Sequence, residues 1–327
     1  MDLNFNRRLS VAPMLDYTDR HERYFLRLLS RHTLLYSEMI TANALLHADP
    51  HRFLRHDTFE HPLAIQLGGS DPKMLATCAK MAEDTGFCEV NLNCGCPSDR
   101  VQSGAFGACL MKEKQCVGEC VSAMQAVVKI PVTVKTRIGI DHDDSWEFFF
   151  DFVKYVADAG CDTFIIHARK AWLKGLSPKE NREKPPLNYD FVYRLKKEMP
   201  HLNISLNGGV RSMDLVESLL TQVDGVMVGR EPYENPWFLA DADTRIFGKP
   251  SVAPPTRKAL LECFLPYMEK ELAGGCPLNI MTRHLFGLFN GFAGARRYRQ
   301  ILSDEAPRTG AGIETVKRAM DAVEEPI

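Results

Sequence analysis

Glu89-Val-Asn-Leu-Asn-Cys-Gly-Cys-Pro-Ser98 is a strand-like run that breaks off at a glycine and a proline, and Val101-Gln-Ser-Gly-Ala-Phe-Gly-Ala-Cys-Leu-Met111 follows it. The break places an asparagine and two cysteines at the mouth of a strand. Pro97 biases Cys96 toward an extended backbone, and Gly95 lets the chain pass close to a ligand. The stretch therefore predicts that the Cys96 thiol is held on a stiff loop at a strand end.

The same unit, a short strand followed by a helix, recurs along the chain. Apolar runs of strand length occur at residues 10–15, 34–40, 62–68, 87–93, 131–138, 163–168, 203–207 and 225–229. Helix-period segments lie between them at 20–31, 72–85, 113–128, 145–159, 189–198 and 212–221. Eight such units predict an α/β fold of the TIM (β/α)8 barrel type. A Rossmann fold would need Gly-x-Gly-x-x-Gly after its first strand, and Ala12-Pro-Met-Leu-Asp16 is no such loop.

The character of the sequence changes after residue 248. Three prolines between residues 250 and 255 form a linker, and residues 257–327 show helix-like segments without a convincing strand. We therefore expect the barrel over residues 1–248 and a small all-helical domain over residues 249–327.

Composition narrows the functional classes. The chain has 327 residues, 45% of them hydrophobic, without an apolar run of about eighteen residues or a signal peptide, so we expect a cytoplasmic protein with no membrane segment. None of the ten cysteines forms a Cys-x-x-Cys pair, and we expect reduced thiols and no metal. The net charge of -2 restricts any nucleic-acid surface to a local patch.

Two glycine turns fall where a barrel of this kind often holds a phosphate, after strands seven and eight. Asn207-Gly-Gly-Val-Arg-Ser212 follows the seventh strand and Gly229-Arg230 the eighth. They offer bare backbone N–H groups, two helix N-termini and a guanidinium to one anion. Other strand ends carry side chains that converge on the same mouth: Met14, Gln66, Asn93, Lys135 and His167.

A flavin mononucleotide accounts for this set economically. Its phosphate would lie at strands seven and eight, Gln66 could hydrogen-bond the polar edge of the ring, and Lys135 could offset the negative charge of reduced flavin near N1. Met14 would pack against the ring. The spacing alone does not separate FMN from another phosphate-bearing ligand, because these barrels host many chemistries.

Six motifs resemble those of the tRNA-dihydrouridine synthases, from about residue 10 to residue 305. They are Ser10-Val-Ala-Pro-Met-Leu-Asp-Tyr-Thr-Asp-Arg20, Asn91-Leu-Asn-Cys-Gly-Cys-Pro-Ser98, Val134-Lys-Thr-Arg-Ile-Gly139, His167-Ala-Arg-Lys170, Leu206-Asn-Gly-Gly-Val210 and Val228-Gly-Arg230. Residues 168–182 are similar to the bacterial A-type subfamily, which acts on tRNA D-loop nucleotides 20 and 20a. Cys94 departs from the pattern, because the family more often has an apolar residue there.

The resemblance implies the roles of individual residues. The family's flavin-binding positions fall on Pro13, Met14, Leu15, Gln66, Lys135, His167, Asn207, Gly208, Gly209, Gly229 and Arg230. Its proton-donating cysteine falls on Cys96 and its RNA-contacting asparagine on Asn93. The implied reaction reduces the C5=C6 bond of uridine to 5,6-dihydrouridine: NADPH reduces FMN, hydride passes to C6, and Cys96 gives a proton to C5. We expect NADPH to use the same open mouth, and the protein to be a monomer.

Two basic segments suggest where tRNA binds. Residues 168–197 contain nine Lys and Arg against three Asp and Glu, a local net charge of +6, and we expect Lys179 and Arg182 to contact backbone phosphates. In the helical domain Arg296 and Arg299 share one expected helix face beside an aromatic ring. We expect this face to grip tRNA by phosphate contacts and stacking.

Two other functions fit part of the sequence. A flavin barrel that reduces a free pyrimidine, similar to the dihydroorotate dehydrogenases, would use Lys135 and Cys96 but would leave the basic segment and the helical domain unexplained. A non-catalytic tRNA-binding protein would use the basic surface but would leave the flavin set idle.

Overall fold

The computed structural model describes residues 5–98 and 106–325. Within them eight parallel strands form one sheet, in the order β1-β8-β7-β6-β5-β4-β3-β2. A parallel bridge between Ser10 and Leu34 brings the first strand back to the start of the second, so the sheet nearly closes on itself and the predicted barrel is confirmed. The strands are β1 (Leu9–Val11), β2 (Leu35–Thr41), β3 (Leu63–Gly68), β4 (Glu89–Cys94), β5 (Val132–Arg137), β6 (Thr163–His167), β7 (Asn203–Asn207) and β8 (Gly225–Val228).

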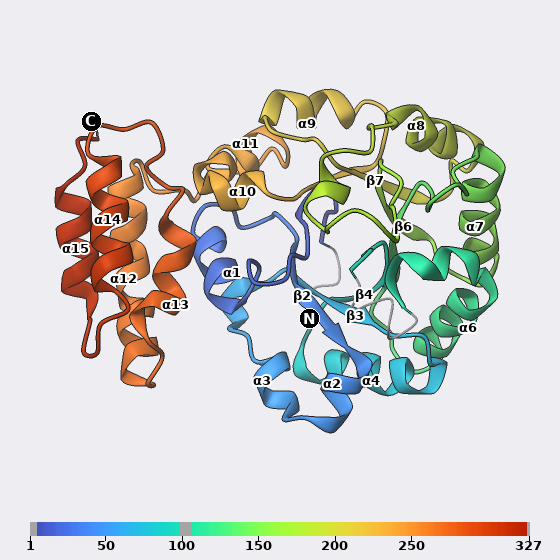
Figure 1. Cartoon of the computed structure of the whole chain (residues 1–327), viewed down its shortest axis with the longest axis horizontal. Coiled ribbons are helices and arrows are strands. Elements are labelled where there is room, and N and C mark those ends of the chain that lie inside the picture. Colours follow the sequence, from blue (N-terminus) through green and yellow to red (C-terminus); the bar gives the residue numbers. More distant parts are fainter. Residues whose placement is uncertain (1–4, 99–105, 326–327) are drawn as a thin grey trace.

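Helices surround the sheet and form the ring on the right of Figure 1. They are α1 (Arg20–Arg27), α2 (Ala42–His47), α3 (Pro50–Leu54), α4 (Pro72–Thr85), α6 (Lys114–Gln125), α7 (Trp146–Asp158), α8 (Tyr189–Glu198), α9 (Met213–Leu219), α10 (Glu231–Glu234) and α11 (Ala242–Arg245). A second group lies to the left and confirms the helical character expected for the C-terminal part: α12 (Arg257–Ala273), α13 (Leu278–Thr282), α14 (Ala295–Glu305) and α15 (Ile313–Asp321). None of the helices in the described part of the chain combines the length and apolar character needed to cross a bilayer.

Local capping signals fix the ends of the outer helices. In α4, Asp71 accepts the backbone N–H of Met74 at 2.9 Å, Pro72 occupies the first turn, and Gly86 ends the helix with φ of +105°. Such a left-handed end favours glycine. The sequence did not predict α2 and α3, because helices this short carry too little periodicity to be recognised.

The barrel and the C-terminal helices share one hydrophobic core. The main apolar cluster fills the space between sheet and helices and continues into the second group. Phe25 of α1 and Phe264 of α12 join the two parts, with ring centroids 5.0 Å apart. A smaller cluster, against which Met14 packs, comprises Ala12, Leu34, Tyr36, Ala64, Cys88, Ile165 and Met227.

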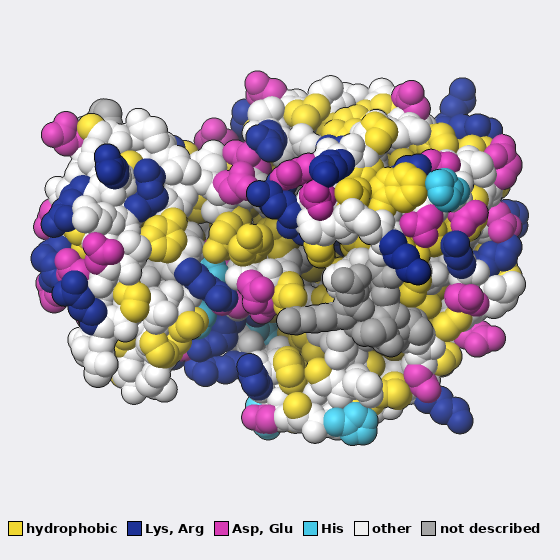
Figure 2. All heavy atoms as spheres, viewed as in Figure 1, with side chains coloured by type: hydrophobic (Ala, Val, Ile, Leu, Met, Phe, Trp, Pro, Cys, Tyr) yellow, Lys and Arg dark blue, Asp and Glu magenta, His cyan; other side chains and the backbone are white. Residues whose placement is uncertain are grey.

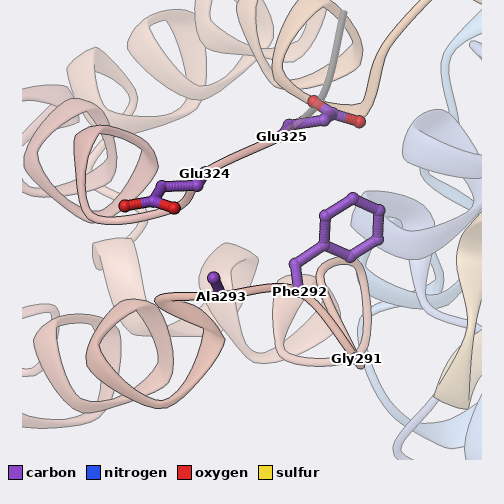
Figure 3. A pocket seen from close by; sticks show the side chains of 5 residues that line it. All are labelled: Gly291, Phe292, Ala293, Glu324 and Glu325. Atoms are coloured by element: carbon purple, nitrogen blue, oxygen red, sulfur yellow. The ribbon is translucent and has the colours of Figure 1, made fainter.

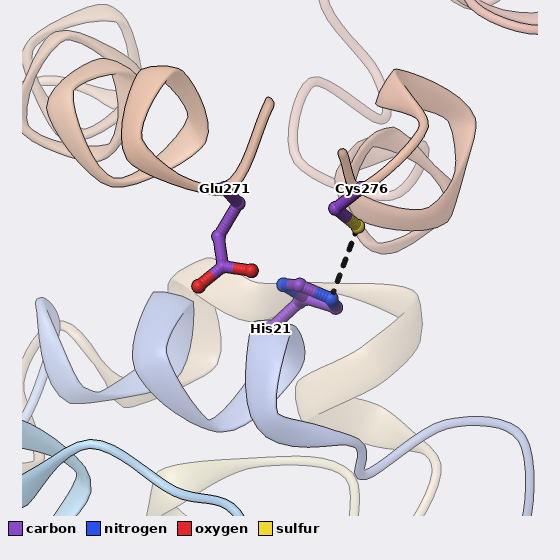
Figure 4. A group of neighbouring side chains, drawn as sticks. All are labelled: His21, Glu271 and Cys276. Atoms are coloured by element: carbon purple, nitrogen blue, oxygen red, sulfur yellow. Dashed lines mark hydrogen bonds between the residues drawn. The ribbon is translucent and has the colours of Figure 1, made fainter. Parts of the chain in front are cut away.

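The polar part of this junction surrounds His21 of α1 (Figure 4). Its Nδ1 lies 2.9 Å from the Tyr267 hydroxyl, and its Nε2 lies 3.6 Å from the Cys276 thiol. His21, Glu271 and Cys276 bring three potential metal-ligating atoms within 4.8 Å of one another. Arg20 pairs with Glu271 at 2.5 Å, so these polar groups already have protein partners, and the cluster ties α1 to the C-terminal helices.

Candidate active site at the barrel mouth

Cys96 lies on the loop that leaves β4. The Asn93 side-chain oxygen accepts the backbone N–H groups of Gly95 and Cys96, both at 3.0 Å. The Cys96 carbonyl accepts the N–H of Ala108 at 2.9 Å, and the thiol lies 3.4 Å from the Ser98 hydroxyl. Because the side chain is only half-buried, the thiol can be reached while its backbone is fixed on both sides.

Cys94, the departure from the family pattern, is fully buried as the last residue of β4. Burial raises the pKa of this thiol well above its usual value. Alternation along the strand separates it from Asn93, because successive side chains point to opposite faces. Cys96 is therefore the more accessible of the two thiols; residues 101–105 of the quoted stretch lie outside the described residues.

Lys135 lies in the C-terminal half of β5, opposite Asn93 in the β4–β5 register. Burial, with the positive charge of Arg137 nearby, lowers the pKa of Lys135 from 10.5 to about 7, and the neighbouring Cys96 acts in the opposite direction. A negative charge nearby therefore stabilises the ammonium form of Lys135. An anionic group bound at this mouth would favour it.

Arg137 is a site residue that the sequence argument missed. Its buried guanidinium donates to the carbonyls of Gly95 at 2.8 Å, Lys170 at 3.0 Å and Asn181 at 3.1 Å. It therefore ties the Cys96 loop to the long loop after β6. Its spacing from Lys135 in one strand was an available signal, since alternate residues of a strand share a face.

His167 at the end of β6 lies between Arg137 and Asn207 in the sheet register. Burial, followed by the positive charges of Arg137 and Lys135, lowers the pKa of His167 well below its usual value. A Cβ on Gly208 would lie 2.8 Å from the His167 ring, and Gly208 has φ of +116°. Only glycine fits there without strain, so the backbone can approach the neutral imidazole.

The corner formed by β6, β7 and β8 contains an unpaired buried donor. Within the described residues, Arg169 Nε is buried without a hydrogen-bond partner, although another nitrogen of this guanidinium donates to the carbonyls of Glu183 and Pro185. Arg230 pairs with the Glu183 carboxylate at 2.6 Å. Burial lowers the pKa of Arg169, and the positive charge of Arg230 acts in the same direction. The nearest atoms to a Cβ built on Gly229 are 4.0 Å away. Two guanidiniums and open backbone fit a phosphate.

The other expected cofactor residues belong to β3 or follow β1 and β7. Gln66 is buried and hydrogen-bonded to the side chains of Asn91 and Asn93, both at 2.8 Å. Pro13 and Met14 are partly buried after β1, whereas Leu15 is 61% exposed. Asn207 and Gly209 complete the turn after β7, where the Asn207 amide donates to the Met227 carbonyl at 2.8 Å.

The basic segment after β6 is ordered around one buried asparagine. Asn181 exchanges hydrogen bonds with the backbone of Trp172, at 2.7 and 2.9 Å, and leaves Lys179 and Arg182 exposed. Neither cation forms an ion pair with the described residues. Four of the nine cations are paired with carboxylates, so the charge count overestimates the free positive charge: Lys170, Lys184, Arg194 and Lys196.

One part of the expected RNA-binding face in the helical group is wrong. Arg296 is exposed and Arg299 is half-buried on α14, where Arg299 donates to Asn290 at 3.0 Å. Tyr298, the aromatic ring proposed for stacking, is fully buried, and its hydroxyl donates to the Leu285 carbonyl at 3.2 Å. It faces the core because it shares the apolar face of α14 with Ala295, Ile301 and Leu302. Of the two expected kinds of RNA contact, stacking is therefore excluded, and only phosphate contacts by Arg296 and Arg299 are left.

A hollow of about 580 Å³ in the helical group is unsuited to a phosphate (Figure 3). The Glu325 carboxylate caps α12 by accepting the N–H groups of Arg257 and Lys258, at 2.8 and 2.9 Å. The acidic lining of the hollow would repel an anion. The lining residues are Gly291, Phe292, Ala293, Glu324 and Glu325.

Basic and hydrophobic side chains gather along the seam between the barrel and the helical group (Figure 2). Tyr17, 37% exposed, packs on Tyr233 there with ring centroids 4.2 Å apart, near the exposed Leu15. Arg55 is exposed on the same junction and reaches Glu271 at 3.3 Å. Apolar rings beside cations suit a polyanion with stacking bases.

Solved structures of distant sequence share the fold. A mutant of morphinone reductase in complex with tetrahydroNAD superposes with a TM-score of 0.52 at 12% identity, over 76% of this chain and 88% of that one. A 2-naphthoyl-CoA reductase complex gives a TM-score of 0.57 at 13% identity, over 74% of this chain and 50% of that one.

Sequence comparison gives a closer relationship. The tRNA-dihydrouridine(20/20a) synthase of Shewanella oneidensis is 57% identical over 321 residues, which are 98% of this chain and 95% of that protein. The protein of the same name from Escherichia coli K12 is 56% identical over 324 residues, 98% and 93% of the two chains. The family model described as dihydrouridine synthase matches residues 10–324. The chain therefore belongs to the dihydrouridine synthase family.

Proposed function

We propose that this chain reduces uridine to 5,6-dihydrouridine at D-loop positions 20 and 20a of tRNA, with FMN as cofactor, NADPH as reductant and Cys96 as proton donor. The observation that carries the proposal is the mouth itself, where an accessible thiol, a lysine of low pKa and a guanidinium corner meet. The names of its close relatives support the substrate.

The residues present fit FMN. Arg169 and Arg230, with the open backbone at Gly208 and Gly229, would hold the phosphate, and Lys135 would lie near the ring. When bound, the flavin supplies the hydride. The protein contributes placement and compensating charge.

Cys96 completes the addition by giving its proton to C5 of the uracil. Loss of that proton leaves a thiolate beside two cations, because Lys135 and Arg137 both interact electrostatically with Cys96. Asn93 holds the loop in place and keeps one amide N–H for the substrate.

A direct test incubates unmodified tRNA or free uridine with the purified protein and NADPH. The proposal expects a yellow protein and dihydrouridine at nucleotides 20 and 20a, found by nucleotide-resolved mapping. Reduction of free uridine in preference to tRNA would favour the free-pyrimidine enzyme. A colourless protein that binds tRNA without changing it would favour the binding module.

Substitution of Lys179 and Arg182 by alanine should raise the KM for tRNA. Each lost phosphate contact should flatten the salt dependence of binding by about one unit of slope. Binding assays across a range of salt concentrations measure this. The matched control replaces Lys80 and Lys154, which are ion-paired on the outer helices, and should leave the slope as it is. An unaltered slope in the first variant would separate this loop from the RNA.

Arg296→Ala combined with Arg299→Ala should give a yellow, NADPH-reducible protein with sharply reduced tRNA affinity. The expected cofactor contacts all lie in the barrel, whereas these guanidiniums lie on α14. Arg297→Ala removes a cation from another side of the same helix and serves as the control. If the double variant binds tRNA like the parent, the helical group grips RNA through another face.

A further inference from the structure

The interior face of β4 is polar along its whole length. Glu89, Asn91 and Asn93 alternate with apolar residues, and all three are buried. Buried polar side chains are costly unless they are hydrogen-bonded. Their partners therefore account for their presence inside the barrel.

These buried side chains form a line of hydrogen bonds along β4. At the start of the strand the line ends in the ion pair between Glu89 and Arg7. Arg7 donates to the Glu89 carboxylate through Nε at 2.8 Å, and a second nitrogen lies 2.7 Å away. The buried Tyr36 hydroxyl lies 2.6 Å from the other oxygen, to which Thr133 also donates at 2.7 Å. An ionised carboxylate only accepts hydrogen bonds, so both hydroxyls are donors here.

That fixed end determines the direction of every later bond. The Thr133 hydroxyl donates its one hydrogen to Glu89. It therefore accepts the hydrogen bond from the Asn91 amide, at 2.9 Å. Asn91 must then present its oxygen to Gln66, at 2.8 Å. Gln66 in turn presents its oxygen to the Asn93 amide, at 2.8 Å. Side-chain amides can otherwise sit in either of two flipped orientations.

The near end of the line reaches the mouth. Asn93 has its amide nitrogen on Gln66, so its oxygen accepts the backbone N–H groups of Gly95 and Cys96. Gln66 and Asn93 each use one amide N–H inside the protein and keep the second for another acceptor. The mouth is therefore set to receive acceptor atoms, such as the carbonyl edge of a flavin or a uracil.

We propose that Glu89, Thr133 and Asn91 are positioning residues, which act through Gln66 and Asn93 to orient the amide donors of the site and the Cys96 loop. The part that concerns the ring rests on the proposed FMN function. The part that concerns the loop does not, because the hydrogen bonds that hold Cys96 are made within the chain.

Thr133→Val tests the chain at its middle link, because valine keeps the shape and removes the hydroxyl. Without FMN, alkylation of Cys96 by iodoacetamide, followed by peptide mass spectrometry, should become faster. With FMN, the dissociation constant should rise about five- to tenfold, the size expected for one lost hydrogen bond, and the flavin midpoint potential should shift. Thr133→Ser keeps the hydroxyl and should restore all three readouts.

Thr163→Val is the matched control. Thr163 is a buried threonine on β6, the strand next to β5. Its hydroxyl donates to Asp162 and takes no part in the line of hydrogen bonds along β4. Thr163→Val should change the thermal stability of the protein but leave Cys96 alkylation, FMN affinity and the flavin midpoint potential as in the parent. Equal readouts for Thr133→Val and Thr133→Ser, or equal changes in the Thr163 control, would overturn the proposal.

Should Thr133→Val be insoluble, Glu89→Gln replaces it, because the new amide can offer an N–H to Thr133 and reverse the line. The same three readouts apply, and parental values for Cys96 alkylation and FMN affinity would overturn the proposal. A parent protein that binds no FMN would instead refute the proposed function, while the alkylation result still decides the positioning of the loop.

Discussion

Cys96→Ala should lower dihydrouridine formation by about 10²- to 10⁴-fold, the range that a positioned general acid contributes. Bound FMN and its reduction by NADPH should persist, because the substitution removes only the proton donor. Single-turnover mixing of the reduced protein with unmodified tRNA measures the oxidative step alone. That step should be slow, whereas flavin reduction in the absence of tRNA should match the parent.

Two other cysteines provide controls for this result. Cys263 is exposed on α12, and its replacement by alanine should change neither step. Cys94→Ala removes a fully buried thiol and should lower thermal stability with little effect on chemistry. A dead Cys94 variant beside an active Cys96 variant would contradict the assignment of the acid.

The barrel could be predicted because its strands are buried on both faces. Such strands appear as apolar runs of strand length, and the helices between them carry caps such as Asp71 and Gly86. The main error was at the first strand, expected over residues 10–15 but ending at Val11. Pro13 lacks a backbone donor, and Thr18 turns the chain back by bonding Met14.

The residues that line the mouth were accessible to sequence reasoning because strand ends meet there. The hydrogen-bond partners of these residues could not be predicted from the sequence. The bond from Arg137 to the Gly95 carbonyl joins residues 42 positions apart, and Thr133 reaches Glu89 across 44 positions. Periodicity gives the face on which a side chain lies, but the partner depends on how neighbouring strands are staggered.

The charge count overestimates the free positive charge for a similar reason. Lys170 pairs with Asp144 and Lys196 with Asp224, both outside the counted segment. Linear composition includes cations that the fold has already neutralised. For Tyr298, burial against the helical core outweighed the arginines that flank it in the sequence.

Lys135→Met should slow FMN reduction by NADPH on the order of 100-fold, the typical effect of removing one preorganised electrostatic group. Methionine keeps most of the side-chain volume, so the loss is that of charge. Stopped-flow absorbance at the flavin band follows the reduction. Lys112→Met is the control, because Lys112 is exposed and pairs with Asp143 at 2.9 Å, and its flavin kinetics should be unchanged.

The pH dependence distinguishes a charge from a packing effect. The pKa of Lys135 is about 7 in the folded protein and 10.5 ordinarily, so between these values the unfolded chain binds more protons than the folded one. Without ligand, stability contributed by this group therefore rises with pH across that window, and Lys135→Met should flatten this rise in melting temperature. A bound anion favours the ammonium, so in the parent the cofactor affinity should fall as pH rises above about 7, the reduction rate of the FMN complex should fall at a higher pH, and both should stay level in the variant. Parallel pH profiles for parent and variant would show that Lys135 does not exert its charge on the ligand.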